Sequence, residues 1–413
     1  MTDQPMPRNT TAADPTAADT TASSATSGKK PLIGVLGASG AVGRAAVREL
    51  RALGHTGLRL GGRTASALCA VAQADPTGHD ETVWADALAP DGLRAFTEGC
   101  DIVLNCVGPT YRLRATVASA ALAAGAHCVD VAGDDPAAED LLKDGDPADD
   151  GRTVVLSAGA LPGLSSLLPR WLARQGLDSA SALTAYCGGL ETCSPTVARD
   201  LMLSLTSGGA DGAAYGEALA AVRGGRRVPR ALRTAEDAEH AAFPGRVALQ
   251  PYLSGESERL ATALGLDRLD WYNVHPGPAV RALLGLLPGR LAAGDDPEEL
   301  ADRLILAADL DLAGRRPYYV MDFALSGTAS ARPATAGLTL RAASSYRLTA
   351  AVGALSVDAV LRGEVPAGVH FACDVLDSDT AMRHLRFQGV ADLRLTGAAA
   401  GRERAEQVEE GVL

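Results

Sequence analysis

Apolar positions along the chain follow two spacings, and both first appear clearly within residues 31–50. An apolar run predicts a strand, and apolar residues at helical spacing predict a helix directly after it (Leu32, Ile33, Val35 and Leu36, then Ala45, Ala46, Val47 and Leu50). A glycine-rich turn separates the two elements. The chain therefore begins its folded part with a strand–turn–helix unit.

The same alternation continues to about residue 157. It predicts further strands at 58–61, 82–85, 102–107, 127–131 and 153–157, with helices at 64–74, 90–97 and 113–124 between them. The run at 102–107 is apolar on both faces, as a central parallel strand should be. We therefore expect an α/β fold with an N-terminal Rossmann-type, doubly wound parallel sheet that binds its ligand at the carboxyl edge.

Beyond residue 163 the predicted strands are separated by long helical or irregular spans. They lie at 181–188, 247–249, 271–274, 318–325 and 338–342. A helix over 346–362 is expected to end at Gly363. This part of the chain is expected to form a second, mixed α/β domain. Residues 1–30 show no apolar periodicity and are expected to be a disordered tail.

Composition narrows the class of protein. The chain has 413 residues, of which 47% are hydrophobic and 21% charged, and a formal net charge of −12. Because no basic patch forms, nucleic acid and anionic membranes are not expected partners, and a small-molecule substrate is. No secretion signal and no stretch of about 18 apolar residues is present, so we expect a cytoplasmic protein.

Cysteine and lysine usage removes several mechanisms. The seven cysteines are scattered without a CxxC pair, which favours reduced thiols over disulfides, and no cluster at ligand spacing predicts a metal site. All lysines are Lys29, Lys30 and Lys143, which leaves little prospect of a Schiff base. No tyrosine has a lysine four residues later, so the Tyr-Lys pair of short-chain dehydrogenases is absent.

The glycine turn is typical of a seat for a dinucleotide pyrophosphate. Gly37 permits a tight turn, Gly40 lets backbone N–H groups approach phosphate, and Gly43 lets the helix lie close to its strand. The spacing is GxxGxxG rather than GxGxxG. The residues expected to bind the cofactor here are Gly37, Ser39, Gly40, Ala41, Val42 and Gly43.

The second predicted strand ends in Gly61-Gly62-Arg63-Thr64, with no carboxylate to select the ribose 2′-hydroxyl of NAD. Arg63 can instead pair with a 2′-phosphate and stack on adenine, and Thr64 can add a hydrogen bond, which favours NADP. The alternative is that Arg63 only caps a surface turn. Asp86, after the third strand, is either an acceptor for the adenine amino group or a helix N-cap.

The ends of the fourth and fifth strands are expected to face nicotinamide. Asn105, Val107, Gly108 and Pro109 are expected to bind the cofactor, and Gly108 and Pro109 would shape a turn against the nicotinamide ribose. Tyr111 is the nearest acid–base candidate, unless it only packs. Asp130 offers a carboxylate at a strand end, in the stretch that runs through Gly133 to Asp134. The alternative for this stretch is a cap for the helix that follows.

Residues 157–166 follow the sixth strand and open a helix. Its exposed N–H groups would suit an anionic substrate group near Gly159, Pro162 and Gly163, although an interdomain hinge would have the same pattern. His127 lies in a strand and is expected in the core. His275 is expected in a loop of the second domain, as a further candidate proton donor.

Taken together, these motifs resemble the saccharopine dehydrogenase-like oxidoreductases. The stretches that carry the resemblance are 37–43, Gly62-Arg63, 101–109, 124–133 and 158–163, and more loosely 346–368. The resemblance implies an NADP-binding Rossmann domain, an inserted α/β domain that often mediates dimerisation, and a C-terminal helix that returns to the first domain. We therefore expect a homodimer with a cofactor domain at 31–160, helix 345–363 packed on it, and a substrate and dimerisation domain at 161–344 and 364–400.

Members of this family commonly form or cleave a secondary amine through an imine, and others reduce different double bonds. We therefore expect NADP-dependent hydride transfer to or from the C=N carbon of an amino-acid-derived or specialised metabolite. One alternative is reduction of a conjugated C=C bond in a specialised metabolite. Another is cysteine-based acyl chemistry at Cys187 or Cys193, which have no obvious histidine partner. The last is a sensor that binds NADP without turnover.

Overall fold

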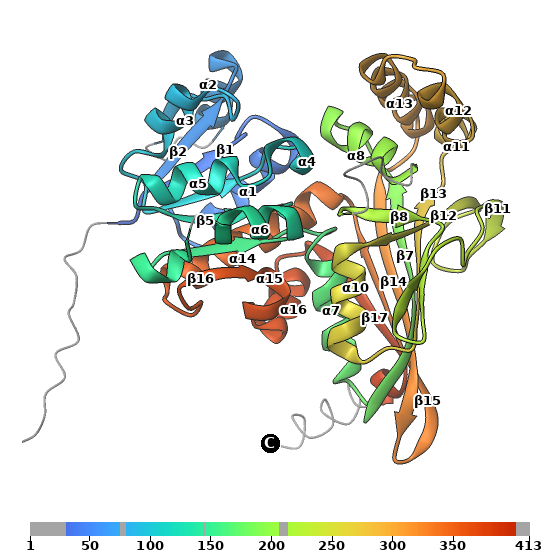
Figure 1. The fold of residues 1–413 in the computed structure, drawn as a ribbon. Helices are drawn as coiled ribbons and strands as arrows, with labels where there is room; N and C mark the ends of the chain where they lie inside the picture. The colour runs from blue at the N-terminus through green and yellow to red at the C-terminus, as the bar shows by residue number, and fades with distance from the viewer. Residues whose placement is uncertain (1–29, 75–79, 144, 206–213, 402–413) are drawn as a thin grey trace, which may run out of the picture. The chain divides into compact units, whose positions relative to one another are not determined.

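A seven-stranded parallel sheet forms the first part of the computed structural model, which describes residues 30–74, 80–143, 145–205 and 214–401 (Figure 1). The predicted tail, apart from Lys30, lies outside the described residues. The strands are ordered β16-β6-β5-β4-β1-β2-β3. Their bounds are β1 (Ile33–Leu36), β2 (Leu58–Gly62), β3 (Glu81–Trp84), β4 (Ile102–Asn105), β5 (His127–Asp130), β6 (Thr153–Leu156) and β16 (Gly368–Phe371).

This strand order confirms the predicted doubly wound α/β fold. The chain runs outward from β1 to β3 on one side and from β4 to β6 on the other. β1 and β4 pair directly, from Ile33 with Ile102 to Leu36 with Asn105. The order therefore reverses between β1 and β4, and in such sheets ligands bind outside the carboxyl ends of the strands at this point.

The helices of this part connect successive strands. They are α1 (Ala41–Ala52), α2 (Ala65–Gln73), α3 (Pro90–Thr97), α4 (Thr110–Leu113), α5 (Thr116–Ala123), α6 (Asp135–Lys143) and the 3-10 helix η1 (Pro147–Asp150). The single helix predicted at 113–124 is instead divided into α4 and α5. Arg114 separates them with a φ of 44°, a backbone conformation that cannot continue a right-handed helix.

β16 comes from the far C-terminal part of the chain and extends the first sheet. It pairs in parallel with β6, from Gly368 with Thr153 to Phe371 with Leu156, and Figure 1 draws it among strands from the other end of the chain. The sequence pattern predicts residues 364–400 in the second domain, so this prediction is wrong for β16. A strand of 4 residues carries too little periodicity to reveal its sheet.

A ten-stranded mixed sheet forms the second part. Its main path is β10-β9-β13-β7-β14-β15-β17, and β12 pairs with β13, β11 and β8. The strands are β7 (Ser179–Leu190), β8 (Gly216–Ala218), β9 (Ala221–Arg223), β10 (Arg226–Val228), β11 (Ala235–Glu239), β12 (Arg246–Ser254), β13 (Arg268–His275), β14 (Tyr318–Ala329), β15 (Arg332–Ala342) and β17 (Ala391–Gly397). The mixed α/β character predicted from the sequence is confirmed.

The remaining helices accompany this sheet, and two of them also contribute side chains to the core of the first. They are α7 (Leu164–Ala173), α8 (Pro195–Leu205), α10 (Gly255–Leu264), α11 (Pro278–Leu284), α12 (Leu287–Ala292), α13 (Pro297–Leu312), α14 (Ser345–Leu361), α15 (Ala372–Val375) and α16 (Ser378–Phe387).

Helix α14 belongs to two hydrophobic cores. Ala350 and Ala354 pack among the β1 and β4 side chains of the first sheet. Leu348 and Leu355 pack in the core of the second sheet. A long helix buried along most of its length thus joins the two sheets. Among the described residues, no helix is both long and apolar enough to cross a membrane.

Candidate functional site

The glycine turn after β1 is closed tightly on itself. Gly37 has a φ of +80°, and a Cβ there would lie 2.6 Å from Cγ1 of Val107. A Cβ on Gly43 would lie 2.1 Å from the carbonyl oxygen of Gly37. Both positions therefore require glycine, and the first contact places the turn directly against the loop that follows β4.

The N-terminus of α1 is open. Its N-cap is Gly40, no side chain caps the helix, and its first turn contains no acidic residue. Gly40 is exposed, and Ser39, Ala41 and Val42 are partly exposed beside it. Free N–H groups and the positive end of the helix dipole fit a pyrophosphate, so the expected cofactor residues have a suitable geometry.

Arg63 lies at the carboxyl end of β2, the neighbour of β1 in the sheet. The side chain is exposed and makes no hydrogen bond or ion pair with any other described residue. Thr64 is the N-cap of α2, but its hydroxyl does not cap the helix. Both side chains are therefore available to a ligand, which suits a 2′-phosphate better than the alternative of a capping role.

Asp86 is engaged in a local turn. Its carboxylate accepts a hydrogen bond from the N–H of Leu88 at 3.0 Å. The N-cap of α3 is Ala89, so Asp86 does not cap that helix, contrary to one of its two expected roles. Contact with adenine stays a prediction.

Asn105 and Asp130 form a buried pair across the ends of β4 and β5. Nδ2 of Asn105 donates to Asp130 at 2.7 Å, and Oδ1 of Asn105 accepts from the N–H of Val107 at 3.1 Å. Asp130 also accepts from the N–H groups of Ala132 and Gly133, each at 2.9 Å. Burial raises the pKa of Asp130, while these hydrogen bonds oppose that increase.

This pairing corrects the role expected for Asp130. Its side chain is 4% exposed and uses both oxygens on its own protein. A carboxylate so enclosed shapes the loops after β4 and β5, and it does not face a reactant. Asn105, predicted to contact the cofactor, is 2% exposed and shapes the same loops.

Tyr111, at the start of α4, lies in a group of tyrosines. Its ring is 6.4 Å from the ring of Tyr215 in an edge-to-face arrangement, and its carbonyl oxygen accepts from the Tyr215 hydroxyl at 3.5 Å. The Tyr252 hydroxyl in turn donates to the carbonyl oxygen of Tyr215 at 3.2 Å. Tyr252 lies in β12 of the second sheet, and Tyr215 lies in the turn directly before β8. The structure therefore brings the predicted acid–base candidate together with residues from the second part of the molecule.

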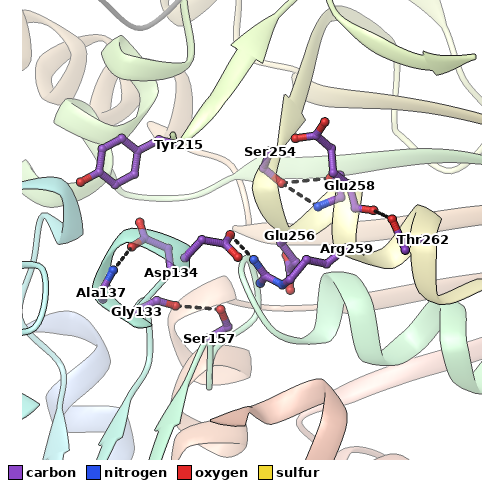
Figure 2. Close-up of polar contacts among 12 residues, drawn as sticks. Gly133, Asp134, Ala137, Ser157, Tyr215, Ser254, Glu256, Glu258, Arg259 and Thr262 are labelled. Carbon is purple, nitrogen blue, oxygen red and sulfur yellow. Dashed lines mark hydrogen bonds and ion pairs between the residues drawn. The ribbon is translucent and has the colours of Figure 1, made fainter. Parts of the chain in front are cut away.

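Two carboxyl groups with displaced pKa values lie near these tyrosines. Burial raises the pKa of Asp134, just after β5, to about 7. The side chain of Asp200, on α8, is exposed, and the protein that surrounds it raises its pKa in the same direction. Burial raises the pKa of Tyr252 to about 12, and the charges of Asp200 and Asp134 add to that increase. The group combines a carboxyl that titrates near neutrality, Asp134, with two phenols that stay protonated, Tyr111 and Tyr252. Figure 2 draws Asp134 and Tyr215 in this region.

The loop of Gly108 and Pro109 also meets the second sheet. A Cβ on Gly108 would lie 2.8 Å from Cγ2 of Thr196, on α8. The loop expected beside the nicotinamide ribose therefore packs against the helix that carries Asp200. Thr110 fixes the other side of this loop, since its hydroxyl donates to the carbonyl oxygen of Ala132 at 3.1 Å.

The N-terminus of α7 is occupied by the protein itself. The N–H of Gly163 donates to Oε1 of Glu256 at 2.7 Å, and the Ser165 hydroxyl donates to Oε2. Glu256 is 7% exposed and comes from α10. This corrects the expectation of a substrate anion at Gly163, because a carboxylate of this chain already holds that position. Gly159 and Pro162 form the turn that precedes it, joined by a hydrogen bond at 3.1 Å.

His275 is the last residue of β13 and pairs with Ala248 of β12, so its expected position in a loop is wrong. Burial lowers the pKa of His275 to about 4, and its Nε2 has no partner in the described structure. It lines a cavity of about 40 Å³ with residues such as Glu191 and Asp311. No hydrogen bond joins it to Tyr111 or Asp130, so the structure does not bring the three predicted catalytic residues together.

The two cysteines considered as nucleophiles have protonated thiols. Cys187 is fully buried, which raises its thiol pKa well above the ordinary value, and burial raises the pKa of Cys193 to about 12. A thiol that stays protonated at neutral pH is a poor nucleophile. Within the described ranges, no group of three or more His, Cys, Asp or Glu residues could hold a metal ion.

Comparison with protein families supplies the class of the first domain. Residues 33–155 match the model of the saccharopine dehydrogenase NADP binding domain. They form a saccharopine dehydrogenase-type NADP-binding domain. NADP is accordingly the cofactor, in agreement with the open α1 N-terminus and the unpaired Arg63. The resemblance inferred from the glycine turn and the ends of β2, β4 and β5 is thus confirmed.

One solved structure shows a likeness in fold that extends beyond the NADP-binding domain. Apo saccharopine dehydrogenase (L-Glu forming) from Saccharomyces cerevisiae is 15% identical, with a TM-score of 0.63, over 89% of this chain and 99% of that one. A triphenylmethane reductase from Citrobacter sp., complexed with NADP(H), is 18% identical, with a TM-score of 0.26, over 42% of this chain and 65% of that one. A search of the curated proteins found no significant match.

Several residues next to the NADP-binding domain were not among the predicted site residues. Asp134 follows closely after a predicted strand, and this position could have identified it as a candidate site residue. Asp200, Tyr215 and Tyr252 follow no motif, because they reach the site from the second part of the molecule. Glu256 lies 93 positions from Gly163, and no local pattern connects the two.

Proposed function

We propose that this protein is an NADP-dependent oxidoreductase that transfers hydride to or from the C=N carbon of a small amine metabolite. The observation that carries the proposal is a juxtaposition. The open N-terminus of α1, which suits a phosphate, lies at the carboxyl edge of the first sheet. Asp134, Tyr111, Tyr215 and Tyr252 gather at the same edge and come from both parts of the molecule.

Each part of the NADP-binding domain has a separate task in this proposal. The Gly40 end of α1 receives the pyrophosphate, and Arg63 receives the 2′-phosphate. The Gly108–Pro109 loop, which the Asn105–Asp130 pair holds in place, lies where the nicotinamide ribose is expected. When bound, NADP(H) donates or accepts the hydride.

The acidic and aromatic group suits a nitrogen that gains or loses a proton. Asp134 has a pKa of about 7, so it can hold or release a proton near neutral pH, and the exposed carboxylate of Asp200 adds negative charge beside it. A protonated imine is positively charged, and carboxylates and tyrosine rings both attract such a cation. A conjugated C=C substrate would develop negative charge instead, which a protonated phenol would also stabilise, so the assay with enones has to distinguish the two.

The proposal is tested by following NADPH oxidation with panels of amine and carbonyl pairs and with enones. We expect consumption with at least one amine and carbonyl pair and none with the enones. Turnover of enones alone would support the C=C alternative. Tight NADPH binding that is lost in Arg63→Ala, with no turnover of any compound, would favour the sensor.

Two further expectations concern assembly and location, and the first of them rests on the resemblance alone. We infer a homodimer formed through the second sheet and a cytoplasmic location. Light scattering of the purified protein tests the first, and a mass of one chain would overturn it. Fractionation of cells tests the second.

A further inference from the structure

Helix α10 makes two separate contacts with loops around the proposed site, and the first is through Glu256. This residue lies in the first turn of α10, directly after the Ser254 cap, which accepts a hydrogen bond from the N–H of Ser257 at 3.1 Å. Its two carboxylate oxygens take the N–H of Gly163 and the hydroxyl of Ser165. All three residues are buried, and the contact fixes the loop that leads from β6 into α7.

The second contact is through Arg259, one turn further along α10. Its guanidinium forms an ion pair with Asp135, the residue after Asp134, and lies 3.7 Å above the centre of the Phe371 ring, at the end of β16. Figure 2 shows Glu256 and Arg259 projecting from α10 toward the loops that carry Gly133, Asp134 and Ser157. Those loops are themselves joined, since the Ser157 hydroxyl donates to the carbonyl oxygen of Gly133 at 2.7 Å.

The start of α10 is also pressed against the same loop. A Cβ added to Gly255 would lie 2.6 Å from Oδ2 of Asp135. The preceding strand, β12, carries Tyr252, whose pKa responds to the charge of Asp134. Any shift of α10 therefore changes the spacing between Asp134 and Tyr252.

We propose that Glu256 and Arg259 are positioning residues that set the spacing between Asp134 and Tyr252. The inference rests on the proposed function for its effect on catalysis, although the mechanical part stands without it. Because Glu256 also fills the N-terminus of α7, a substrate carboxylate does not bind there. The substrate is then recognised through its nitrogen, at Asp134, Asp200 and the tyrosines.

The test compares four variants. Glu256→Ala removes both contacts of the carboxylate, whereas Glu256→Gln retains an acceptor for Gly163 and a partner for Ser165. Glu258→Gln is the matched control, because it makes the same change of charge on the same helix, at a residue that pairs with Arg227. Arg259→Leu probes the second contact independently.

The first readout needs no substrate. We expect hydrogen–deuterium exchange in the NADP-loaded Glu256→Ala protein to accelerate about tenfold or more at residues 159–167 and also at 133–138. Glu256→Gln is expected to restore slow exchange, and Glu258→Gln to leave both segments unchanged. Acceleration confined to α10, or an equal effect in Glu258→Gln, would overturn the positioning role.

The second readout separates positioning from simple loss of structure. Loss of hydrogen bonds to a charged group predicts an increase of about tenfold or more in KM for the amine substrate in Glu256→Ala and Arg259→Leu, with NADPH affinity within about twofold of the wild type. Equal loss of NADPH affinity, or no change in KM, would overturn the proposal. Absence of turnover by the wild type would instead refute the proposed function. The positioning role of Glu256 and Arg259 would then be tested by the hydrogen–deuterium exchange measurements alone.

Discussion

Two helices of this protein begin after a glycine-containing turn at the carboxyl edge of the first sheet, and they differ in what meets their N–H groups. At α1, Gly40 is exposed and no side chain caps the helix. At α7, Gly163 and Ser165 bind the buried carboxylate of Glu256. The first end is open to a ligand anion, and the second is satisfied internally.

The difference shows that a helix N-terminus becomes a ligand site only where the fold leaves it unoccupied. Both ends have the composition and the dipole expected of an anion site. Only the tertiary structure brings Glu256 to one of them. The cofactor half of the site is therefore built locally by the NADP-binding domain, whereas the substrate half depends on residues that converge from distant parts of the chain.

The largest expected effect comes from a substitution that disrupts the open N-terminus of α1. Gly43→Ala places a Cβ 2.1 Å from the carbonyl oxygen of Gly37, so either the turn or α1 must move. We expect NADPH affinity, measured by fluorescence titration, to fall about 100-fold or more, or the protein not to fold. Gly289→Ala is the control, since a Cβ there meets nothing within 4 Å. Unchanged NADPH binding by a folded Gly43→Ala protein would contradict the account.

A smaller effect is expected from a substitution that tests how the NADP-binding domain recognises the 2′-phosphate. Arg63→Ala removes the unpaired guanidinium expected to hold the 2′-phosphate, and charge-assisted hydrogen bonds of this kind predict a loss of about 10- to 100-fold in NADPH affinity. NADH affinity is expected to change little. Arg94→Ala, at an exposed arginine of α3, is the control. The same loss for NADH and NADPH would remove the 2′-phosphate from the explanation.

The next prediction concerns the pH dependence of the substrate half. Folding raises the pKa of Asp134 from 3.8 to about 7, so ionisation of Asp134 opposes folding. This cost is absent below about pH 4, grows as the pH rises toward 7, and is constant above it. Asp134→Asn is therefore expected to flatten the fall in the free energy of unfolding over this range. Urea unfolding at several pH values measures it, and an unchanged slope would show that Asp134 has an ordinary pKa.

The last prediction is that one cysteine substitution leaves catalysis unchanged. Cys193→Ser replaces a thiol whose pKa is raised to about 12 and which donates only to the neighbouring Ser194 carbonyl oxygen, at 3.6 Å. If the substrate half works through carboxyls and tyrosines, kcat/KM stays within about twofold of the wild type. A loss of several orders of magnitude would revive the cysteine mechanism.

The predictable parts of the fold are those whose signal is local. The strands and helices from β1 to β6 follow short periodic patterns, and their order follows from the handedness of βαβ units. The position of β16 in the first sheet could not be predicted, because the strand is short and its neighbour β6 is distant in sequence. The break between α4 and α5 could not be predicted, because no residue type in the sequence indicates the positive φ of Arg114.

The same rule explains which site residues could be predicted. Gly37, Gly43 and Arg63 act through the strand and turn that contain them, so the sequence identifies them directly. Asp130 and His275 were chosen for residue type and position, but burial gives Asp130 a structural role and places His275 at a strand end. Asp200 and Glu256 enter through tertiary packing alone, which no single-sequence pattern encodes.

A structure of the protein with NADP bound tests the central contrast most directly. The account predicts the pyrophosphate at the Gly40 end of α1, the 2′-phosphate on Arg63, and Glu256 still on Gly163 and Ser165. A phosphate or a substrate carboxylate at the N-terminus of α7, with Glu256 displaced, would contradict it.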